Sequence, residues 1–301
     1  MKRYKKSASL WLAAVLVCAL LAGCGSDNGR TVTVIDGDFA EMKLFTQVAR
    51  IMIESHTDIH VKVQDSMASS LAFQQIRDGK MDIYMSYDGS LLTAYLGKDP
   101  SEVPEGMTVY EYANQLGMET ANVMLTPKLG GQNTYMVGVK RELADKLGLT
   151  CVSDLKPHAP ELRFAAEHEF FDEGSKHYDA FAAFYALDFA QSSTLDRGLK
   201  YMAMDSGNMD VTVVYSTDGL NKKSDIVTLK DDLEFFPDYQ GAYIVRKNLF
   251  QEYPELEEVF SMLEGHFNND TCTELNYRID VEGEDPYDVA LDHLKQEKLL
   301  P

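Results

Sequence analysis

The hydrophobic positions along the chain change their period several times, and each change predicts a new element of secondary structure. β-Branched or alternating runs predict strands, and apolar residues at helical spacing between them predict helices. The first series comprises a strand at 31–35, a helix at 39–55, a strand at 59–63, a helix at 69–77 and a strand at 81–85. The second comprises strands at 135–139, 162–166 and 210–215, with helices at 141–146 and 178–187. Such alternation is typical of a parallel sheet with covering helices, and two series indicate two α/β units with a cleft between them.

The N-terminal segment has a different pattern. Four basic residues among the first six precede an almost wholly apolar run at 10–23, which ends in small residues before Cys24. This is the layout of a bacterial lipoprotein signal, in which the cysteine opens the mature chain and carries the lipids. A membrane-spanning helix is the alternative, but the run would reach only about 21 Å across a hydrocarbon core of about 30 Å. We therefore expect a lipoprotein signal peptide at 1–23, a lipidated Cys24 and a tether at 24–30, with the protein lipid-anchored at the extracellular face of the cell membrane.

The chain is acidic. Its formal net charge of −20 becomes −24 when the four basic residues of the signal are removed. Lys and Arg are scattered, so nucleic acid is not expected as a partner, whereas a cationic or zwitterionic ligand is compatible with this charge. A length of 301 residues and a hydrophobic content of 45% suffice for two lobes.

The cysteines add little to this picture. Once the signal is removed and Cys24 is lipidated, Cys151 and Cys272 are left to form a disulfide. We favour free thiols, because the expected topology puts the two residues on different lobes. Neither cysteine lies near a His or Cys at ligand spacing, so neither a metal site nor a cofactor is expected.

Tyrosines stand at the ends of several predicted strands. Tyr87 and Tyr215 come where strands end, Tyr135 opens the second series, and Tyr239 precedes residues 241–245, the expected return crossing. Ligands of open α/β sheets bind beyond the carboxyl ends of strands, so these tyrosines are expected at the cleft. A single such tyrosine more often packs with its hydroxyl satisfied. Several together can surround a quaternary ammonium, which has no N–H to donate, and each face contributes about 0.5 to 2 kcal/mol.

Motifs spread over residues 31–298 resemble one known family. They are Asp82-Ile83 leading to Tyr87-Asp88-Gly89, Asn133-Thr134-Tyr135 with Glu142-Leu143-Ala144, Val152-Ser153-Asp154-Leu155, Glu167-His168-Glu169-Phe170-Phe171, Tyr215-Ser216-Thr217-Asp218-Gly219, Asp231-Asp232 through Phe235-Phe236-Pro237, and Leu275-Asn276-Tyr277. In this order and spacing, the chain resembles the extracellular substrate-binding proteins of ABC importers for quaternary ammonium compatible solutes such as glycine betaine, carnitine and choline.

The resemblance implies an α/β fold of the type II periplasmic-binding-protein kind, with the ligand cleft between two lobes. Lobe 1 would comprise residues 31–134 and 240–301, and lobe 2 residues 135–239. Closure would take place about a hinge near 135–139 and 240–245.

The resemblance also implies the site and the partners. Carried over by motif, the cage for a trimethylammonium head would be formed by Tyr87, Tyr135, Tyr215 and Tyr239, with Asn133 and Ser90 near the other end of the ligand. The protein would be a monomer and not an enzyme. It would capture its ligand and pass it to a separate ABC permease and ATPase for osmoprotectant uptake.

Two regions depart from the family pattern. Gly37 stands where relatives often carry a polar side chain, and its acidic neighbour Asp38, also a candidate ligand-binding residue, would repel a ligand carboxylate if it faced the cleft. Ser66-Met67-Ala68 occupies a turn that is frequently glycine-rich in relatives. These differences leave open the choice among betaine, carnitine and choline. They also leave room for another betaine such as ergothioneine, or for a small cation that is not quaternary.

The segment Glu167-His168-Glu169 invites a metal or catalytic interpretation. In an extended segment the two carboxylates would lie on one side and the histidine on the other, which suits neither a helical metal site nor a carboxylate dyad. We expect it to end a strand at the cleft edge of lobe 2, with Glu169 as a partner for a ligand cation. An enzyme on this scaffold would need a nucleophile with a neighbouring base, and the sequence indicates none. A structural or adhesive lipoprotein would not need tyrosines gathered at strand ends.

Overall fold

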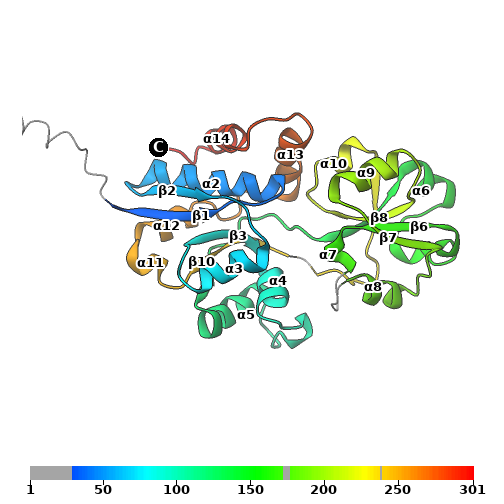
Figure 1. Ribbon diagram of the computed structural model, residues 1–301, viewed down its shortest axis with the longest axis horizontal. Helices are drawn as coiled ribbons and strands as arrows, with labels where there is room; N and C mark the ends of the chain where they lie inside the picture. The colour runs from blue at the N-terminus through cyan, green and yellow to red at the C-terminus, as the bar shows by residue number, and fades with distance from the viewer. Residues whose placement is uncertain (1–28, 172–176, 238) are drawn as a thin grey trace, which may run out of the picture.

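The computed structural model of the protein describes residues 29–171, 177–237 and 239–301. It consists of two lobes, each built on a five-stranded sheet with helices packed against it (Figure 1). The sheet on the left of Figure 1 contains the first strands of the chain and the last one, and we call this part lobe 1. The sheet on the right contains the strands between them, and we call this part lobe 2. The expected two-lobed α/β fold is confirmed.

The sheet of lobe 1 has the strand order β2-β1-β3-β10-β4. Its strands are β1 (Thr31–Ile35), β2 (His60–Gln64), β3 (Ile83–Tyr87), β4 (Val123–Leu125) and β10 (Gly241–Arg246). Its helices are α2 (Ala40–His56), α3 (Ser69–Arg77), α4 (Asp88–Ser90), α5 (Val109–Leu116), α11 (Leu249–Glu252), α12 (Glu255–Ser261), α13 (Asn269–Asp280) and α14 (Pro286–Gln296). Short π-helical and 3₁₀ segments at Leu91–Tyr95, Pro100–Glu102 and Gly117–Ala121 join them.

The sheet of lobe 2 has the strand order β7-β6-β8-β5-β9. Its strands are β5 (Tyr135–Lys140), β6 (Arg163–Ala166), β7 (Gln191–Thr194), β8 (Val211–Tyr215) and β9 (Ile226–Leu229). Its helices are α6 (Arg141–Leu147), α7 (His168–Phe171), α8 (Tyr178–Tyr185), α9 (Arg197–Asp205) and α10 (Leu220–Lys223), with 3₁₀ turns at Val152–Leu155 and Ala159–Glu161.

The expectation of parallel sheets is wrong in one respect, because both sheets are mixed. In lobe 1, β1 pairs in parallel with β2 and β3, but β10 runs antiparallel to β3 and β4. In lobe 2, β5 runs antiparallel to β8 and β9. Each of the antiparallel strands, β5 and β10, is the first strand that the chain forms after crossing from the other lobe. Such a strand enters its sheet from the cleft side and therefore runs against its neighbours.

The expected return crossing at 241–245 is also misplaced. These residues form β10, which is hydrogen-bonded on both sides within the sheet of lobe 1. The strand at 135–139 is likewise bonded on both sides, as β5 of lobe 2. The chain crosses instead along 126–134 and 230–240, and the two crossing segments pair at Gln132 and Gln240 (Figure 1). The residues expected to form a hinge at 135–139 and 241–245 therefore lie in paired strands, and the lobes are connected by the two crossing segments.

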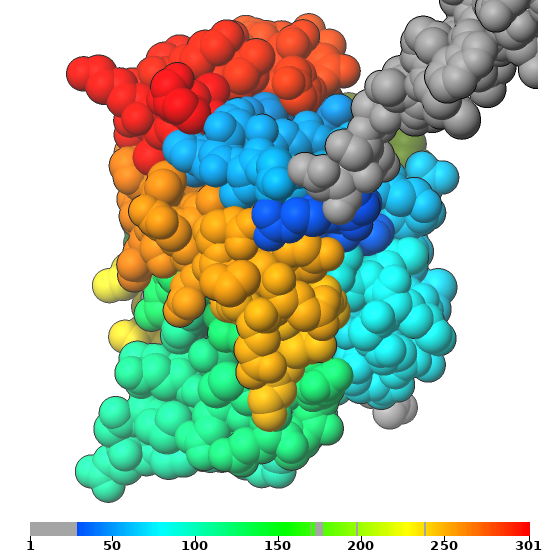
Figure 2. Space-filling view, turned by 90° about the vertical axis from the view of Figure 1, so that its left-hand side faces the viewer, coloured from blue at the N-terminus to red at the C-terminus, as the bar shows by residue number. Residues whose placement is uncertain are grey.

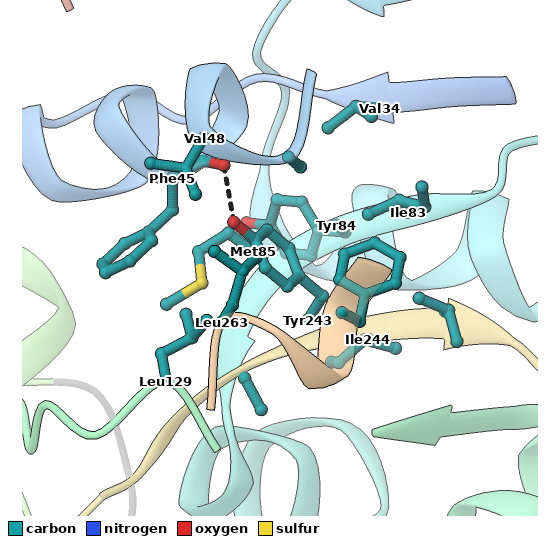
Figure 3. Close-up of a cluster of buried hydrophobic side chains, with 14 of the residues drawn as sticks. Val34, Phe45, Val48, Ile83, Tyr84, Met85, Leu129, Tyr243, Ile244 and Leu263 are labelled. Atoms are coloured by element: carbon teal, nitrogen blue, oxygen red, sulfur yellow. Dashed lines mark hydrogen bonds between the residues drawn. The ribbon is translucent and has the colours of Figure 1, made fainter. Parts of the chain in front are cut away.

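The core of lobe 1 lies between α2 and the sheet (Figure 3). The ring of Phe45 of α2 lies edge to face with that of Tyr243 of β10, with 6.5 Å between centroids, and the Tyr243 ring is fully buried. The Tyr243 hydroxyl donates a hydrogen bond to the carbonyl oxygen of Phe45 at 2.7 Å, so its one polar atom is satisfied. Burial raises the pKa of Tyr243 well above its ordinary value. Burying a side chain such as Phe45 stabilises the fold by about 1.5 to 3 kcal/mol, which explains why the apolar face of α2 fixes this helix on the sheet.

The C-terminal helices complete the outer layer of lobe 1. Seen from the end of the molecule, the residues of α14 (red) lie against α2 (light blue), and the segment of α11 and α12 (orange) lies below them (Figure 2). The outward face of α2 is therefore covered, which agrees with the large number of its residues that are buried.

Lobe 2 touches lobe 1 away from the crossing segments as well. Gly219, just before α10, lies so close to α13 that a Cβ atom there would be 2.5 Å from the backbone nitrogen of Tyr277. The Nζ atom of Lys222 lies 4.9 Å from the centroid of the Tyr277 ring. Only glycine permits this close approach of the two backbones.

The N-terminal predictions concern residues that the structure does not describe. The signal peptide at 1–23, the lipidated Cys24 and most of the tether at 24–30 lie outside the described residues. Among the residues that are described, no helix combines the length and the apolar character needed to cross a membrane. Cys151 in lobe 2 and Cys272 in lobe 1 are both free.

Candidate functional site

A hollow lies at the junction of the two lobes. Its walls come from the start of α2, the first crossing segment, the loop after β8, and α13. The residues that line it are Phe39, Ala40, Glu41, Asn133, Tyr215, Thr217, Asp218, Asn276 and Asp280. Two of the predicted site residues, Asn133 and Tyr215, are therefore in its wall.

Glu41 is part of this wall and accepts four side-chain hydrogen bonds. Its side chain is only 3% exposed, and it stands in the first turn of α2, where the helix dipole favours a carboxylate. Its Oε1 atom accepts hydrogen bonds from the Tyr87 hydroxyl at 2.5 Å and from Asn133 Nδ2 at 3.1 Å. Its Oε2 atom accepts from the Thr217 hydroxyl and from Asn276 Nδ2. No local pattern in the sequence marks this residue as part of a site.

Tyr87, at the end of β3, is held by these hydrogen bonds. Besides donating to Glu41, its hydroxyl accepts a hydrogen bond from Asn133 Nδ2 at 3.0 Å. Burial, together with the neighbouring Glu41 carboxylate, raises the pKa of Tyr87 well above its ordinary value. The phenol therefore stays neutral and remains a donor, and its ring is fixed beside the hollow.

Two tyrosines of lobe 2 form an aromatic wall. Tyr135 and Tyr215 are directly opposite in the β5–β8 ladder, and their ring centroids are 5.1 Å apart. Phe39 of lobe 1 lies across the junction, with its ring centroid 6.3 Å from that of Tyr215 and its plane within 15°. Phe170 and Phe236 pack against Tyr135 from within lobe 2, at 5.1 Å and 5.9 Å between centroids. The positions of the Tyr135 and Tyr215 rings are thus fixed by the neighbouring aromatic rings.

A buried ion pair stands beside this wall. Lys200 is completely buried, forms an ion pair with Glu167 and donates a hydrogen bond to the carbonyl oxygen of Val213 at 2.8 Å. Its Nζ atom lies 5.5 Å from the centroid of the Tyr215 ring. Breaking a buried ion pair by removing one partner costs about 3 to 5 kcal/mol. Removing Glu167 would therefore leave an unpaired buried charge beside the Tyr215 ring.

The segment around Glu167 differs from the expected extended segment. Strand β6 ends at Ala166 and the short helix α7 begins at His168, which is exposed. The side chain of Glu169, predicted as a partner for a ligand cation, lies outside the described part of the structure. In the described part of the chain, no three His, Cys, Asp or Glu side chains come together as metal ligands would.

Tyr239 packs on lobe 1, against Gly89 at the start of α4. A Cβ atom at position 89 would lie 1.9 Å from ring atoms of Tyr239, so only glycine leaves room for this ring. Burial raises the pKa of Tyr239, and its interaction with the Thr93 hydroxyl partly offsets that shift. Ser90 is half-buried in the same turn. Asp38 is exposed and is not among the described side chains that line the hollow.

The chain is similar to several known proteins over most of its length. The family model described as the substrate-binding domain of ABC-type glycine betaine transport systems matches residues 30–296. A glycine-betaine-binding protein of Pseudomonas aeruginosa is 30% identical over 301 residues, which cover 95% of this chain and 94% of that protein. A Helicobacter pylori protein named ergothioneine transport permease/ergothioneine binding protein is 27% identical over 85% of this chain, and the chain covers 46% of that protein. Among solved structures, one titled as a glycine betaine/carnitine/choline ABC transporter superposes with a TM-score of 0.77 at 27% identity, covering 89% of this chain and 98% of that one.

Proposed function

The chain belongs to the family of substrate-binding domains of ABC-type glycine betaine transport systems, and from this premise we propose that it captures a quaternary ammonium compound in the hollow between its lobes. It is a substrate-binding protein of a transporter for ligands of the betaine, carnitine and choline type, and it is not an enzyme. The exact cargo, the tyrosine cage and the lipid anchor belong to the proposal.

The observation that carries the proposal is the meeting of aromatic faces and a buried carboxylate at one hollow. Tyr215 and Glu41 are both part of its wall, and the ring of Tyr135 stands 5.1 Å from that of Tyr215. A quaternary ammonium cannot donate hydrogen bonds, so its recognition depends on ring faces and on negative charge. Each ring contributes about 0.5 to 2 kcal/mol to binding, and micromolar affinity requires about 8 kcal/mol in total. Several rings and a carboxylate together are sufficient for this.

Of the other two predicted cage residues, Tyr87 ends strand β3 of lobe 1, and Tyr239 lies in a crossing segment and packs on lobe 1. Tyr87 reaches the site through its hydrogen bond to Glu41, and Tyr239 is positioned by its contact with Gly89. A cage shared between the lobes is complete only when they close. Ligand capture would therefore favour the closed form, with movement about the crossing segments 126–134 and 230–240.

The cargo is proposed to be glycine betaine, carnitine or choline, taken up as an osmoprotectant. Ergothioneine is a second candidate, supported by the name of the Helicobacter pylori relative and by the trimethylammonium group that this betaine shares with the others. Ser90 is proposed to contact the other end of the ligand. Asn133 is expected there too from the resemblance, but it donates a hydrogen bond to Glu41 and is therefore proposed to stand beside the head group. For Asn133, the support is its place in the wall of the hollow.

The anchor and the partners are proposed from the sequence. Lipidation of Cys24 would hold the protein at the extracellular face of the cell membrane, since two or three acyl chains anchor stably where one does not. The closed protein would then meet an ABC permease whose ATPase drives uptake. Replacement of Cys24 by serine is expected to release the protein from the membrane fraction.

Calorimetric titration with glycine betaine, carnitine, choline and ergothioneine tests the proposal. The protein used is the mature chain carrying Cys24→Ser, so that it stays in solution without lipids. Micromolar binding of at least one of the four supports quaternary ammonium capture, and the order of affinities identifies the cargo. Absence of binding by all four contradicts the proposal.

A further inference from the structure

The Glu41 carboxylate is buried and carries a negative charge that its neighbours do not balance. All four of its hydrogen-bond donors, Tyr87, Asn133, Thr217 and Asn276, are uncharged. Among the side chains that the structure describes, no Lys or Arg forms an ion pair with it. Each carboxylate oxygen accepts two hydrogen bonds, which is the arrangement of an ionised, acceptor-only group. A buried carboxylate without a countercharge is costly, so a group that supplies positive charge at this place is strongly favoured.

We propose that Glu41 is the residue that makes the site select positively charged head groups over neutral groups of the same shape. This inference rests on the proposed function and assigns the selection to Glu41 and not to Asp218 or Asp280, the other carboxylates that line the hollow. Glu41 is the one of the three that is shown to be held from both lobes, whereas Asp218 accepts its hydrogen bonds from Tyr201 and Leu220 within lobe 2. Ring faces bind a tert-butyl group through contact area alone and a trimethylammonium through area and charge. A carboxylate in the wall adds Coulomb attraction that only the cation receives, and the low dielectric of a buried site increases it.

The origin of the four donors links this selection to closure. Tyr87 and Asn276 belong to lobe 1, Asn133 to a crossing segment, and Thr217 to lobe 2. The carboxylate is therefore held in place from both lobes at once. Opening of the lobes would separate Thr217 from Glu41 and expose the carboxylate to water, where its attraction for a cation is weak. Charge selection is thus strongest in the closed form.

Carbon isosteres of the ligands provide the test. Choline is compared with 3,3-dimethylbutan-1-ol, and glycine betaine with 3,3-dimethylbutanoate, since each pair differs by one positive charge on the same shape. Affinities are measured by calorimetry for the wild-type chain, for Glu41→Gln and for Glu41→Asp. The matched control is Glu54→Gln, the same chemical change further along α2, at a residue that bonds Val61 and Arg50 away from the hollow.

The wild type is expected to prefer the cation of at least one pair by about a hundredfold or more, and Glu41→Gln to lower this preference at least about tenfold. Glu41→Asp keeps the charge and should retain the preference even if both ligands bind more weakly, while Glu54→Gln should behave as wild type.

If Glu41→Gln weakens the binding of the cation and of its isostere by the same factor, the residue has only a structural role and the inference fails. Should that variant not fold, a wild-type preference below about tenfold overturns the inference by itself. A wild type that binds carnitine or ergothioneine but neither choline nor glycine betaine also overturns it, and one that binds none of the four contradicts the proposed function as well.

Discussion

Glu41, in the first turn of α2, accepts a hydrogen bond from the hydroxyl of Thr217, in the loop that follows β8 on the other lobe. The two residues are 176 positions apart in the chain, and both are almost completely buried. This bond joins the lobes directly at the candidate site. Its strength therefore bears both on closure and on the position of the carboxylate.

Replacement of Thr217 by valine tests that link. Valine keeps the shape of the side chain and removes the donor to Glu41, so ligand affinity is expected to fall about tenfold, the effect of losing one hydrogen bond of about 1.5 kcal/mol to a charged group. Calorimetric titration with the tightest ligand measures this change. Thr212→Val is the matched control, because the Thr212 hydroxyl bonds Ala165 inside lobe 2 and should affect stability alone. Equal affinities of Thr217→Val and wild type would argue against the link.

Tyr215 is predicted to bind the ligand through its ring face and not through its hydroxyl. Tyr215→Leu should weaken binding by about 1 to 3 kcal/mol, because packing is lost together with the cation-π attraction. Tyr215→Phe keeps the ring and should bind within about threefold of wild type. The same titration measures both variants. Similar losses in both would mean that the hydroxyl, and not the ring, makes the contact.

Gly89 is predicted to be required for the position of Tyr239. In Gly89→Ala the new methyl group would overlap the Tyr239 ring, and displacing that ring should lower the free energy of unfolding by about 1 to 3 kcal/mol and weaken ligand binding. Gly198→Ala, in α9, meets no atom within 4 Å and should be neutral or stabilise by up to about 1 kcal/mol. Thermal unfolding and titration of the two variants give the comparison. A Gly89→Ala protein as stable and as tightly binding as wild type would show that Tyr239 is free to move without effect.

His293 in α14 gives lobe 1 a pH-dependent stability. Burial lowers the pKa of His293 below its ordinary value of 6.5, and the nearby Arg278 acts in the same direction while Glu297 opposes this shift. Because the folded state favours the neutral ring, its contribution is fully present above the unfolded pKa of 6.5 and is lost as pH falls through the lower folded pKa. The free energy of unfolding should therefore decrease between pH 7.5 and pH 5. His293→Gln should reduce that slope. Urea unfolding of the wild type and of the variant at several pH values measures the change, and equal slopes in the two proteins would contradict the prediction.

The sequence predicts local elements better than it predicts the neighbours of a residue. The spacing of hydrophobic residues predicts the strand at 31–35 and the helix at 69–77 with the same bounds as in the structure, since both elements depend on residues close in the chain. It does not predict β7, whose residues Gln191–Thr194 are polar and mostly exposed, so that no hydrophobic pattern marks them. The direction of a strand after a crossing depends on the fold of both lobes. The hydrophobic pattern of a single strand therefore does not predict that the sheets are mixed.

The same limit explains which parts of the site could be predicted. Tyr135 and Tyr215 can be predicted as candidates because tyrosines at strand ends are a local signal, and the ladder places them opposite one another. Glu41 has no such signal, because its donors come from positions 87, 133, 217 and 276 and meet only in the folded chain. Phe39, which also lines the hollow, has a local signal, because it is an aromatic residue between the first strand and the helix that follows it.

A crystal structure with the tightest-binding quaternary ammonium compound would test the central claim most directly. We expect the trimethylammonium nitrogen to lie within about 6 Å of the ring centroids of Tyr135 and Tyr215, on the side where Glu41 lines the hollow. A ligand bound at another place on either lobe, with these rings packed only against protein, would contradict the account.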